Sequence, residues 1–128
     1  LDNIVIKRNY TPDLPVIMID EKLMQEVFMN ILNNARDAMG PGGSVEISTS
    51  LEGDHLRIDF KDSGKGMPQD VLEKVFVPFF TTKEKGTGLG LAVCYSIVKA
   101  HNGQFKMDSA PGKGTTATIL LPVNPPSA

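Results

Sequence analysis

The chain has 128 residues, of which 41% are hydrophobic and 22% charged, and its formal net charge is −2. These values predict one globular domain with a core large enough to fold without disulfides. The slightly negative charge gives no reason to expect nucleic acid as a partner. No stretch approaches the ~20 apolar residues of a membrane span.

The single cysteine, Cys94, excludes an internal disulfide. It lies in an apolar helical pattern, where a small buried side chain is the simplest interpretation. A reducing, cytoplasmic setting fits this composition. The N-terminal residues lack a signal-peptide pattern, and the chain does not begin with methionine. We therefore expect an excised fragment of a longer protein.

The first third of the chain predicts two strands and one long helix. Ile4 to Arg8 and Val16 to Ile19 are apolar runs on either side of a proline-containing loop, and each is expected to form a strand. Asp20 is suited to cap a helix that runs from about Glu21 to Met39 and stops at a group of glycines.

One margin of this helix carries a polar row, Glu26-Asn30-Asn34-Asp37, beside the apolar face. At about 100° per residue these four side chains point to the same side. A polar margin is usually a solvated border. Asparagine, however, disfavours helix interiors because it competes for the backbone. The row is therefore either a border or a set of ligand contacts.

A predicted hairpin follows the helix. Ser44 to Leu51 and His55 to Phe60 alternate apolar and polar residues around a short turn. The second strand runs into Asp62, which is followed by Gly64 and Gly66, and these glycines allow the backbone to approach a ligand closely. A carboxylate at this point can accept a hydrogen bond from an exocyclic amine such as that of adenine. The alternative is an aspartate that only stabilises a turn.

The next segment predicts a short helix and then a lid. Pro68 to Val75 suits a helix that begins with proline. Val75 to Gly86 combines three phenylalanines with threonines and lysines and ends at glycine, which is typical of a lid with an aromatic anchor and a glycine hinge. The alternative is an aromatic plug in the core beneath an ordinary loop.

Alternating glycines from Gly86 to Gly90 precede an apolar helical pattern that continues to Ala100. Bare backbone N–H groups at the positive end of a helix dipole suit phosphate. The spacing matches neither a P-loop nor a dinucleotide fingerprint, and a tight turn before a helix is the alternative. Two further strands are expected, at Gln104 to Ala110 and at Thr115 to Leu121.

Four short motifs therefore occur in a fixed order. They are Asn30-x-x-x-Asn34-Ala35, Asp62-x-Gly64-x-Gly66, Phe76-x-Pro78-Phe79 and Gly86-Thr87-Gly88-Leu89-Gly90-Leu91. In this order the chain resembles the ATP-binding catalytic domain of sensor histidine kinases, within the superfamily that includes DNA gyrase and MutL-type ATPases. The motifs look like the N, G1, F and G2 boxes of that family, and the resemblance extends from about Ile4 to Pro122.

The resemblance implies a two-layer α/β sandwich, with a mixed sheet of about five strands, three helices on one face and an ATP lid. The six strand-like runs and three helices expected from the pattern are compatible with this fold. Residues 1–122 would form the catalytic domain and residues 123–128 a C-terminal tail.

The resemblance also implies ATP or ADP and Mg²⁺ as ligands. Asp62 would receive the adenine amine, Asn34 would contact the metal, and Asn30 and Lys83 would act at the phosphates as catalytic residues. The full nucleotide-binding set implied by the resemblance is Asn30, Asn34, Asp37, Asp62, Gly64, Gly66, Met67, Phe79, Thr82, Lys83, Gly86, Thr87, Gly88, Leu89, Gly90, Leu91, Thr115 and Thr116.

The mechanism expected from the resemblance is transfer rather than hydrolysis. Where the ATPase branch carries a glutamate that activates water, this chain has Asn30, which cannot act as a base. The acceptor would be a histidine. His55 and His101 both lack the acidic residue that directly follows the family's acceptor.

The acceptor histidine would therefore lie on a dimerisation hairpin outside this chain. The implied partners are that hairpin and a response regulator, with a monomeric fragment, a homodimeric parent kinase and no nucleic acid. The location would be cytoplasmic, in a parent that is free or membrane-anchored.

Three other functions remain open at this point. A serine kinase of the same superfamily shares the four motifs, and a nucleotide-sensing or docking module without catalysis could also retain them. A hydrolysing ATPase of the gyrase type is disfavoured by Asn30.

Overall fold

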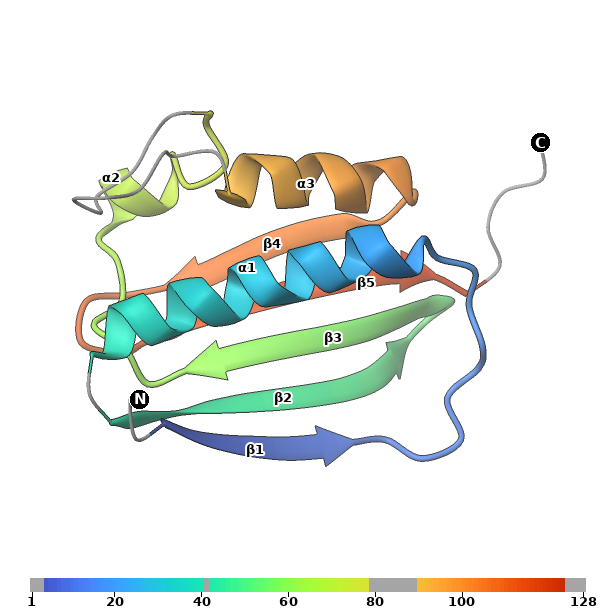
Figure 1. Cartoon of the computed structure of the whole chain (residues 1–128), viewed down its shortest axis with the longest axis horizontal. Coiled ribbons are helices and arrows are strands. Elements are labelled where there is room, and N and C mark those ends of the chain that lie inside the picture. Colours follow the sequence, from blue (N-terminus) through green and yellow to red (C-terminus); the bar gives the residue numbers. More distant parts are fainter. Residues whose placement is uncertain (1–3, 41, 79–89, 124–128) are drawn as a thin grey trace.

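The computed structural model describes residues 4–40, 42–78 and 90–123, which form a two-layer α/β sandwich (Figure 1). Helices cover one face of a five-stranded mixed sheet with strand order β1-β2-β3-β5-β4. The expected fold class is confirmed. The elements in chain order are β1 Ile4–Tyr10, α1 Glu21–Met39, β2 Gly43–Glu52, β3 His55–Asp62, α2 Gln69–Leu72, α3 Gly90–Ala100, β4 Gln104–Ser109 and β5 Thr115–Pro122.

The strand pairing brings the end of β3 next to the starts of β2 and β5. β1 pairs in parallel with β2, and the other three pairs, β2–β3, β3–β5 and β4–β5, are antiparallel. In the resulting register Asp62, the last residue of β3, lies between Val45 near the start of β2 and Thr115 at the start of β5. Loops that are far apart in the sequence therefore meet at this end of the sheet.

The core lies between the sheet and helices α1 and α3. The apolar face expected for α1 is buried at its centre and partly buried at its margins, and the ring centroids of Phe28 and Phe60 are 5.6 Å apart. Phe76 packs against Tyr95 and Phe105, with ring centroids 5.0 and 4.9 Å apart. Phe76 therefore belongs to the core, as the plug interpretation expects. The central buried set is Met24, Val27, Ile31, Ile58, Phe60, Cys94, Ile97, Val98, Phe105, Ala117, Ile119 and Leu121.

The ends of α1 are set by the residues that the sequence singled out. The Oδ1 atom of Asp20 accepts a hydrogen bond from the N–H of Leu23 at 3.0 Å, which satisfies one of the free donors in the first turn. At the other end Gly40 has a φ of 64° and its N–H donates to the carbonyl of Arg36. The helix therefore begins and ends where the sequence predicted.

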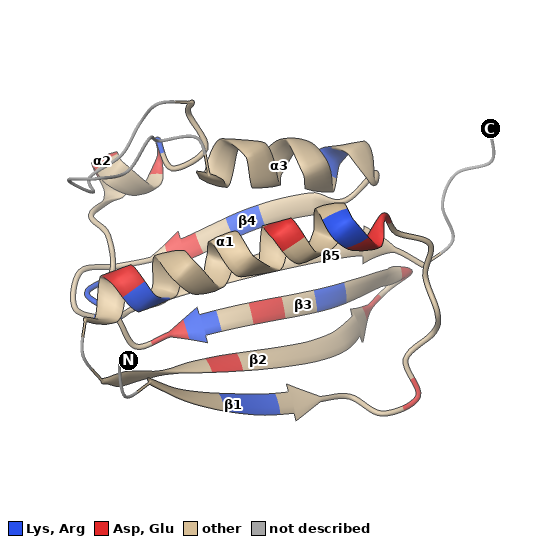
Figure 2. Ribbon diagram, in the orientation of Figure 1, with Lys and Arg blue, Asp and Glu red and all other residues tan. Residues whose placement is uncertain are grey.

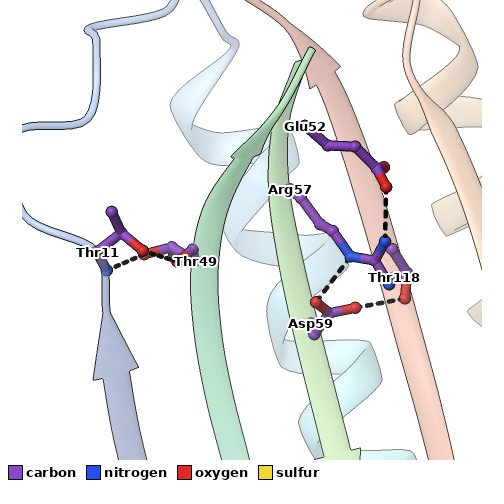
Figure 3. Close-up of polar contacts among 6 residues, drawn as sticks. All are labelled: Thr11, Thr49, Glu52, Arg57, Asp59 and Thr118. Atoms are coloured by element: carbon purple, nitrogen blue, oxygen red, sulfur yellow. Dashed lines mark hydrogen bonds and ion pairs between the residues drawn. The ribbon is translucent and has the colours of Figure 1, made fainter. Parts of the chain in front are cut away.

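The sheet register puts mostly polar residues of β2 and β3 on the face away from the helices, and Figure 2 marks the charged ones along these strands. Arg57 Nε donates to Asp59 at 2.9 Å and its Nη1 to Glu52 at 3.1 Å, while Thr118 Oγ1 donates to Asp59 at 2.6 Å (Figure 3). The bond to Asp59 raises the pKa of Arg57, against the effect of burial. This network connects β3 to β5 across the uncovered face.

The expectation of a strand at Val16 to Ile19 is wrong. These residues form no strand, and Val16 and Met18 are 94% and 84% exposed. After β1, Thr11 still bonds to Thr49 of β2 (Figure 3), and the chain then crosses from the sheet edge to the helix layer (Figure 1). Only Ile17 of this run packs against the core. An apolar run needs a neighbouring strand as well as the right pattern, and here β1 already occupies that edge of β2.

His101 joins the two long helices. Its Nδ1 lies 2.8 Å from the carbonyl oxygen of Ile97, so Nδ1 carries the proton, and its Nε2 accepts from the N–H of Asp20 at 2.9 Å. Both ring nitrogens are thereby used in holding the end of α3 against the start of α1. His101 therefore makes a structural contact between the ends of two helices.

We expect His101→Ala to lower the free energy of unfolding by about 1 kcal/mol, because the amide of Asp20 loses its acceptor. Urea denaturation would measure this change. The matched control is His55→Ala, because the ring of His55 bonds to the exposed carboxylate of the neighbouring residue Asp54 and bridges no helices. This substitution should change stability by less than about 0.5 kcal/mol. Equal effects of the two substitutions would contradict a bridging role for His101.

In the described residues, no helix has both the length and the apolar character needed to cross a membrane.

Candidate functional site

The buried carboxylate of Asp62 lies at the end of β3 and is 9% exposed. Its Oδ1 accepts hydrogen bonds from the N–H of Gly64 at 2.9 Å and of Thr115 at 3.2 Å. Burial raises the pKa of this carboxyl group, and the two N–H donors oppose that rise. Within the described part of the chain both bonds go to Oδ1, and no buried side-chain oxygen is left without a partner. Oδ2 therefore remains accessible to a donor from a ligand.

This raised pKa gives a pH prediction with a definite sign. A carboxyl group whose pKa is higher in the folded state stabilises the fold when protonated, and this contribution is lost as the pH rises above the ordinary value of 3.8 and through the folded pKa. We therefore expect the unfolding free energy of the wild type, relative to Asp62→Asn, to increase as the pH falls from 7 towards 4. Urea denaturation of both proteins across this range measures the difference, and a constant difference would contradict it.

Two glycines let the loop after Asp62 pack tightly. A Cβ on Gly64 would lie 2.9 Å from the Cβ of Ala38 in α1, and one on Gly66 would lie 1.9 Å from the carbonyl oxygen of Ala110. Gly66 also has a φ of 71°, which disfavours other residues. The N–H of Lys65 donates to the carbonyl of Ala38 at 3.2 Å. The loop is therefore fixed between the last turn of α1 and the β4–β5 turn.

Ser109 supports this loop, and the sequence analysis did not identify it. Its hydroxyl accepts from the N–H of Met67 at 2.8 Å, donates to the carbonyl of Gly114 at 2.9 Å and lies 2.8 Å from the hydroxyl of Thr115. One hydroxyl thus uses its donor and both acceptor positions. Serine at a strand end carries no motif of its own, so only the pairing of β4 with β5 reveals this role.

The polar row of α1 faces α3. The Oδ1 atom of Asn30 lies 3.5 Å from the position that a Cβ on Gly90 would take, at the first residue of α3. Burial raises the pKa of the Cys94 thiol to about 11; a hydrogen bond with the side chain of Asn30 lowers it, and Glu26 raises it further. Both row residues therefore lie close to α3. Cys94 is a buried thiol, as the sequence indicated.

The other two residues of the row continue along α1 towards its C-terminus. Asn34 is half-buried, and Asp37 is exposed with its carboxylate 3.7 Å from Arg36 Nε. The row is thus partly covered where it passes α3 and open to solvent at its end.

The structure brings together most of the described residues that the sequence singled out. Asp62, Gly64, Gly66, Met67 and Thr115 surround the end of β3, and Asn30 faces the start of α3 at Gly90 and Leu91.

Thr116 is not brought to this cluster. It pairs with Lys61, so it lies on the opposite face of the sheet from Thr115 and Asp62. Seven predicted residues lie outside the described ranges: Phe79, Thr82, Lys83, Gly86, Thr87, Gly88 and Leu89.

The side-chain oxygens on α1 suit a metal ion that is coordinated mainly by the phosphates of a bound ligand. In the described ranges no group of three or more His, Cys, Asp or Glu side chains could hold a metal ion. The side-chain oxygens of Asn30 and Asn34 are hard oxygen donors, which Mg²⁺ accepts as one or two ligands beside phosphate and water.

Comparison with known sequences identifies the family. Residues 19–125 match the family described as histidine kinase-, DNA gyrase B- and HSP90-like ATPases. The chain belongs to this family. The match covers α1, the Asp62 loop and α3, which are the elements that form the site, and it confirms the resemblance on which the sequence interpretation rested.

Curated relatives from this family are sensor kinases. The chain is 46% identical over 124 residues to Sporulation kinase C of Bacillus subtilis (strain 168), which covers 96% of this chain and 29% of the relative. It is 44% identical over 111 residues to the sensor histidine kinase ZraS of Escherichia coli (strain K12), covering 87% of this chain and 24% of the relative. The chain therefore spans less than a third of the length of these relatives.

Solved structures show the same fold. The nucleotide-free catalytic domain of histidine kinase ThkA superposes with a TM-score of 0.85 at 30% identity, covering 96% of this chain and 82% of that one. Full-length ShkA in complex with AMPPNP superposes with a TM-score of 0.83 at 27% identity, covering 98% of this chain and 27% of that one. The site described above therefore lies in a histidine-kinase type of ATPase domain.

Proposed function

We propose that this chain binds ATP with Mg²⁺ and donates the γ-phosphate to a histidine on a separate dimerisation hairpin, as the catalytic part of a two-component sensor histidine kinase. The parent would be a homodimer that passes the phosphate to a response regulator, and this domain would work in the cytoplasm. Residues 1–122 would form the catalytic domain and 123–128 a tail.

The observation that carries the proposal is the placement of two different polar sites along one helix. The Asp62 loop is fixed to the last turn of α1 at Ala38, and Asn30 meets the start of α3 two turns earlier. Eight helical residues span about 12 Å. A carboxylate that suits an adenine amine is thus separated from a phosphate-binding helix start by the extent of a nucleoside triphosphate. The complex of ShkA with AMPPNP, in a chain of the same fold, supports nucleotide binding.

At the phosphate end, Asn30 and Asn34 would hold the metal and its waters. When bound, Mg²⁺ would neutralise charge on the phosphates. Lys83, Thr82 and the glycines from Gly86 to Gly88 remain proposed phosphate contacts from the lid, with Phe79 anchoring it. The start of α3 at Gly90 and Leu91 would add N–H groups and the positive end of the helix dipole.

The amide of Asn30 favours transfer over hydrolysis, because an amide cannot remove a proton from water. Transfer breaks the bond between the γ-phosphorus and the β,γ-bridging oxygen, forms a bond from the phosphorus to an imidazole nitrogen and releases ADP. Glu26 is the next carboxylate along the row, but it lies two turns before Asn34 and faces Cys94 of α3. In this proposal it does not act as the base. In this proposal the chain positions the phosphates and leaves the nucleophile to the acceptor hairpin.

A phosphotransfer assay tests this function. The chain is mixed with Mg²⁺ and ATP labelled in the γ-phosphate, together with a separately produced hairpin from the same parent gene that carries a histidine followed by an acidic residue. We expect the label to move to the hairpin in an acid-labile form, with little free phosphate released. Intact ADP binding without any transfer would overturn the proposal and favour a nucleotide-sensing module.

Asn30→Ala should reduce transfer by about tenfold or more, since it removes a contact at the phosphates. Gln25→Ala is the matched control, because Gln25 is an exposed residue of the same helix that lies about 140° around the helix axis from Asn30. It should leave the transfer rate unchanged within about twofold. Equal losses in the two variants would indicate damage to α1 rather than to the site.

A further inference from the structure

A cavity lies on the far side of the strand that carries Asp62. It has a volume of about 390 Å³ and opens on the sheet face away from the helices. The lining residues come from β1, β2, the end of β3 and the β4–β5 turn: Lys7, Ser44, Glu46, Lys61, Asp62, Ser63, Gly112, Lys113 and Gly114. This cavity is separate from the polar row of α1, because the sheet lies between them.

The sheet register explains how the basic side chains gather there. Lys7 pairs with Glu46, and Glu46 pairs with Lys61, so these three side chains form one row across β1, β2 and β3. Directly opposed side chains on one face are about 5 Å apart. Lys113 reaches the same cavity from the turn before β5. Figure 2 shows basic segments on β1 and at the end of β3 with an acidic segment of β2 between them.

The charges in this cavity are not internally compensated. Three ammonium groups face one carboxylate in this cavity, that of Glu46, because the side chain of Asp62 lies on the other face of the sheet with Val45 and Thr115. In the described part of the chain, none of the three lysines takes part in an ion pair or a side-chain hydrogen bond. Other charges on the same face are paired, as in the network of Arg57 with Asp59 and Glu52.

We propose that this cavity is a second anion site, which binds a phosphate group through Lys7, Lys61 and Lys113. Lysine ammonium groups bind phosphate as point charges, and the hydroxyl of Ser44 supplies a neutral donor at the rim. The volume accommodates a small molecule. The phosphate would be either the free ion or a phosphomonoester, which share the recognised group.

The test is a titration followed residue by residue. The whole ¹⁵N-labelled chain, with ADP and Mg²⁺ present in excess, is titrated at constant ionic strength with inorganic phosphate and, in a second series, with glycerol 2-phosphate. We expect saturable shifts of the amides of Lys61, Lys113 and Gly114 in at least one series. Tighter binding of the ester would assign the site to a phosphorylated metabolite, and tighter binding of phosphate to the free ion.

Three variants and one control variant make the result specific. Lys61→Gln and Lys113→Gln should each weaken binding by about tenfold, since each removes one charged contact. Glu46→Gln should strengthen binding several-fold, because it removes a carboxylate that repels the ligand. Lys106→Gln is the matched control, since Lys106 lies on the same face in register with Thr118 and outside the cavity. It should leave the affinity unchanged within about twofold.

Shifts confined to residues near Asn30 and α3, or equal effects of Lys106→Gln and Lys61→Gln, would overturn the proposal. The result does not depend on the proposed kinase function. If ADP fails to bind, the amides around Lys61 still report on phosphate binding in this cavity. If phosphate fails to bind in the cavity, ADP binding is still measured in the same spectra.

Discussion

Asp62→Asn should weaken ADP binding by about 100-fold, which corresponds to about 3 kcal/mol. The asparagine keeps the size of the side chain and retains an oxygen for the N–H groups of Gly64 and Thr115. Its NH₂ group then takes the place of Oδ2, so that two donors face each other where we propose that the adenine amine binds. A charge-assisted hydrogen bond worth about 1.5–3 kcal/mol is lost, and a donor is left unpaired.

Calorimetric titration with ADP and Mg²⁺ measures this effect. The matched control is Asp59→Asn, the same change on the same strand but on the opposite face, where Asp59 contacts Arg57 and Thr118. Asp59→Asn should leave ADP affinity unchanged within about twofold. An Asp62→Asn protein that binds ADP nearly as well as the wild type would remove Asp62 from the nucleotide site and with it the proposed orientation of the ligand.

Gly66→Ala should lower the free energy of unfolding by about 3 kcal/mol or more. The new Cβ would lie 1.9 Å from the carbonyl oxygen of Ala110, at a φ of 71°, so that contact and backbone conformation are both unfavourable. Because the clash is with backbone rather than with a flexible side chain, the loop or the β4–β5 turn must move. ADP binding should weaken as well, since the same loop carries Asp62.

Gly53→Ala separates the steric clash from the unfavourable backbone conformation as causes of the loss of stability. Gly53 has a φ of 62°, close to that of Gly66, but a Cβ there would meet nothing within 4 Å. This control should cost only about 1 kcal/mol and leave ADP binding intact. Urea denaturation of the three proteins gives both differences. If Gly66→Ala were no worse than Gly53→Ala, the tight packing between this loop and Ala110 would not be important for stability.

The elements that the sequence predicted well are those defined by local chemistry. The helix from Glu21 to Met39 follows from an apolar repeat with a period of 3.6, an aspartate cap and a terminal glycine. The hairpin from Gly43 to Asp62 follows from alternation around a short turn. These signals act over a few residues, so they are readable without knowledge of the rest of the chain.

The predictions that failed or were missing depend on long-range pairing. Val16 to Ile19 has the composition of a strand, but β1 already occupies the edge of β2, and the run leads to the helix layer instead. Ser109 gains its three contacts only because β4 ends beside β5 and the Asp62 loop. Thr115 and Thr116 are adjacent in sequence, yet they lie on opposite faces of the sheet, and the register with β3 decides which of them meets Asp62.

By itself, the sequence determined the order of the four motifs, the residue types at each of them and the absence of a base at Asn30. These are properties of single positions and short spacings. The tertiary structure decided that the polar row of α1 faces the start of α3, that Asp62 is buried under two N–H donors, and that Lys7, Lys61 and Lys113 share a cavity on the other face. Strand order and register produce these arrangements, because a local pattern specifies which side of an element is apolar but not which element will cover it.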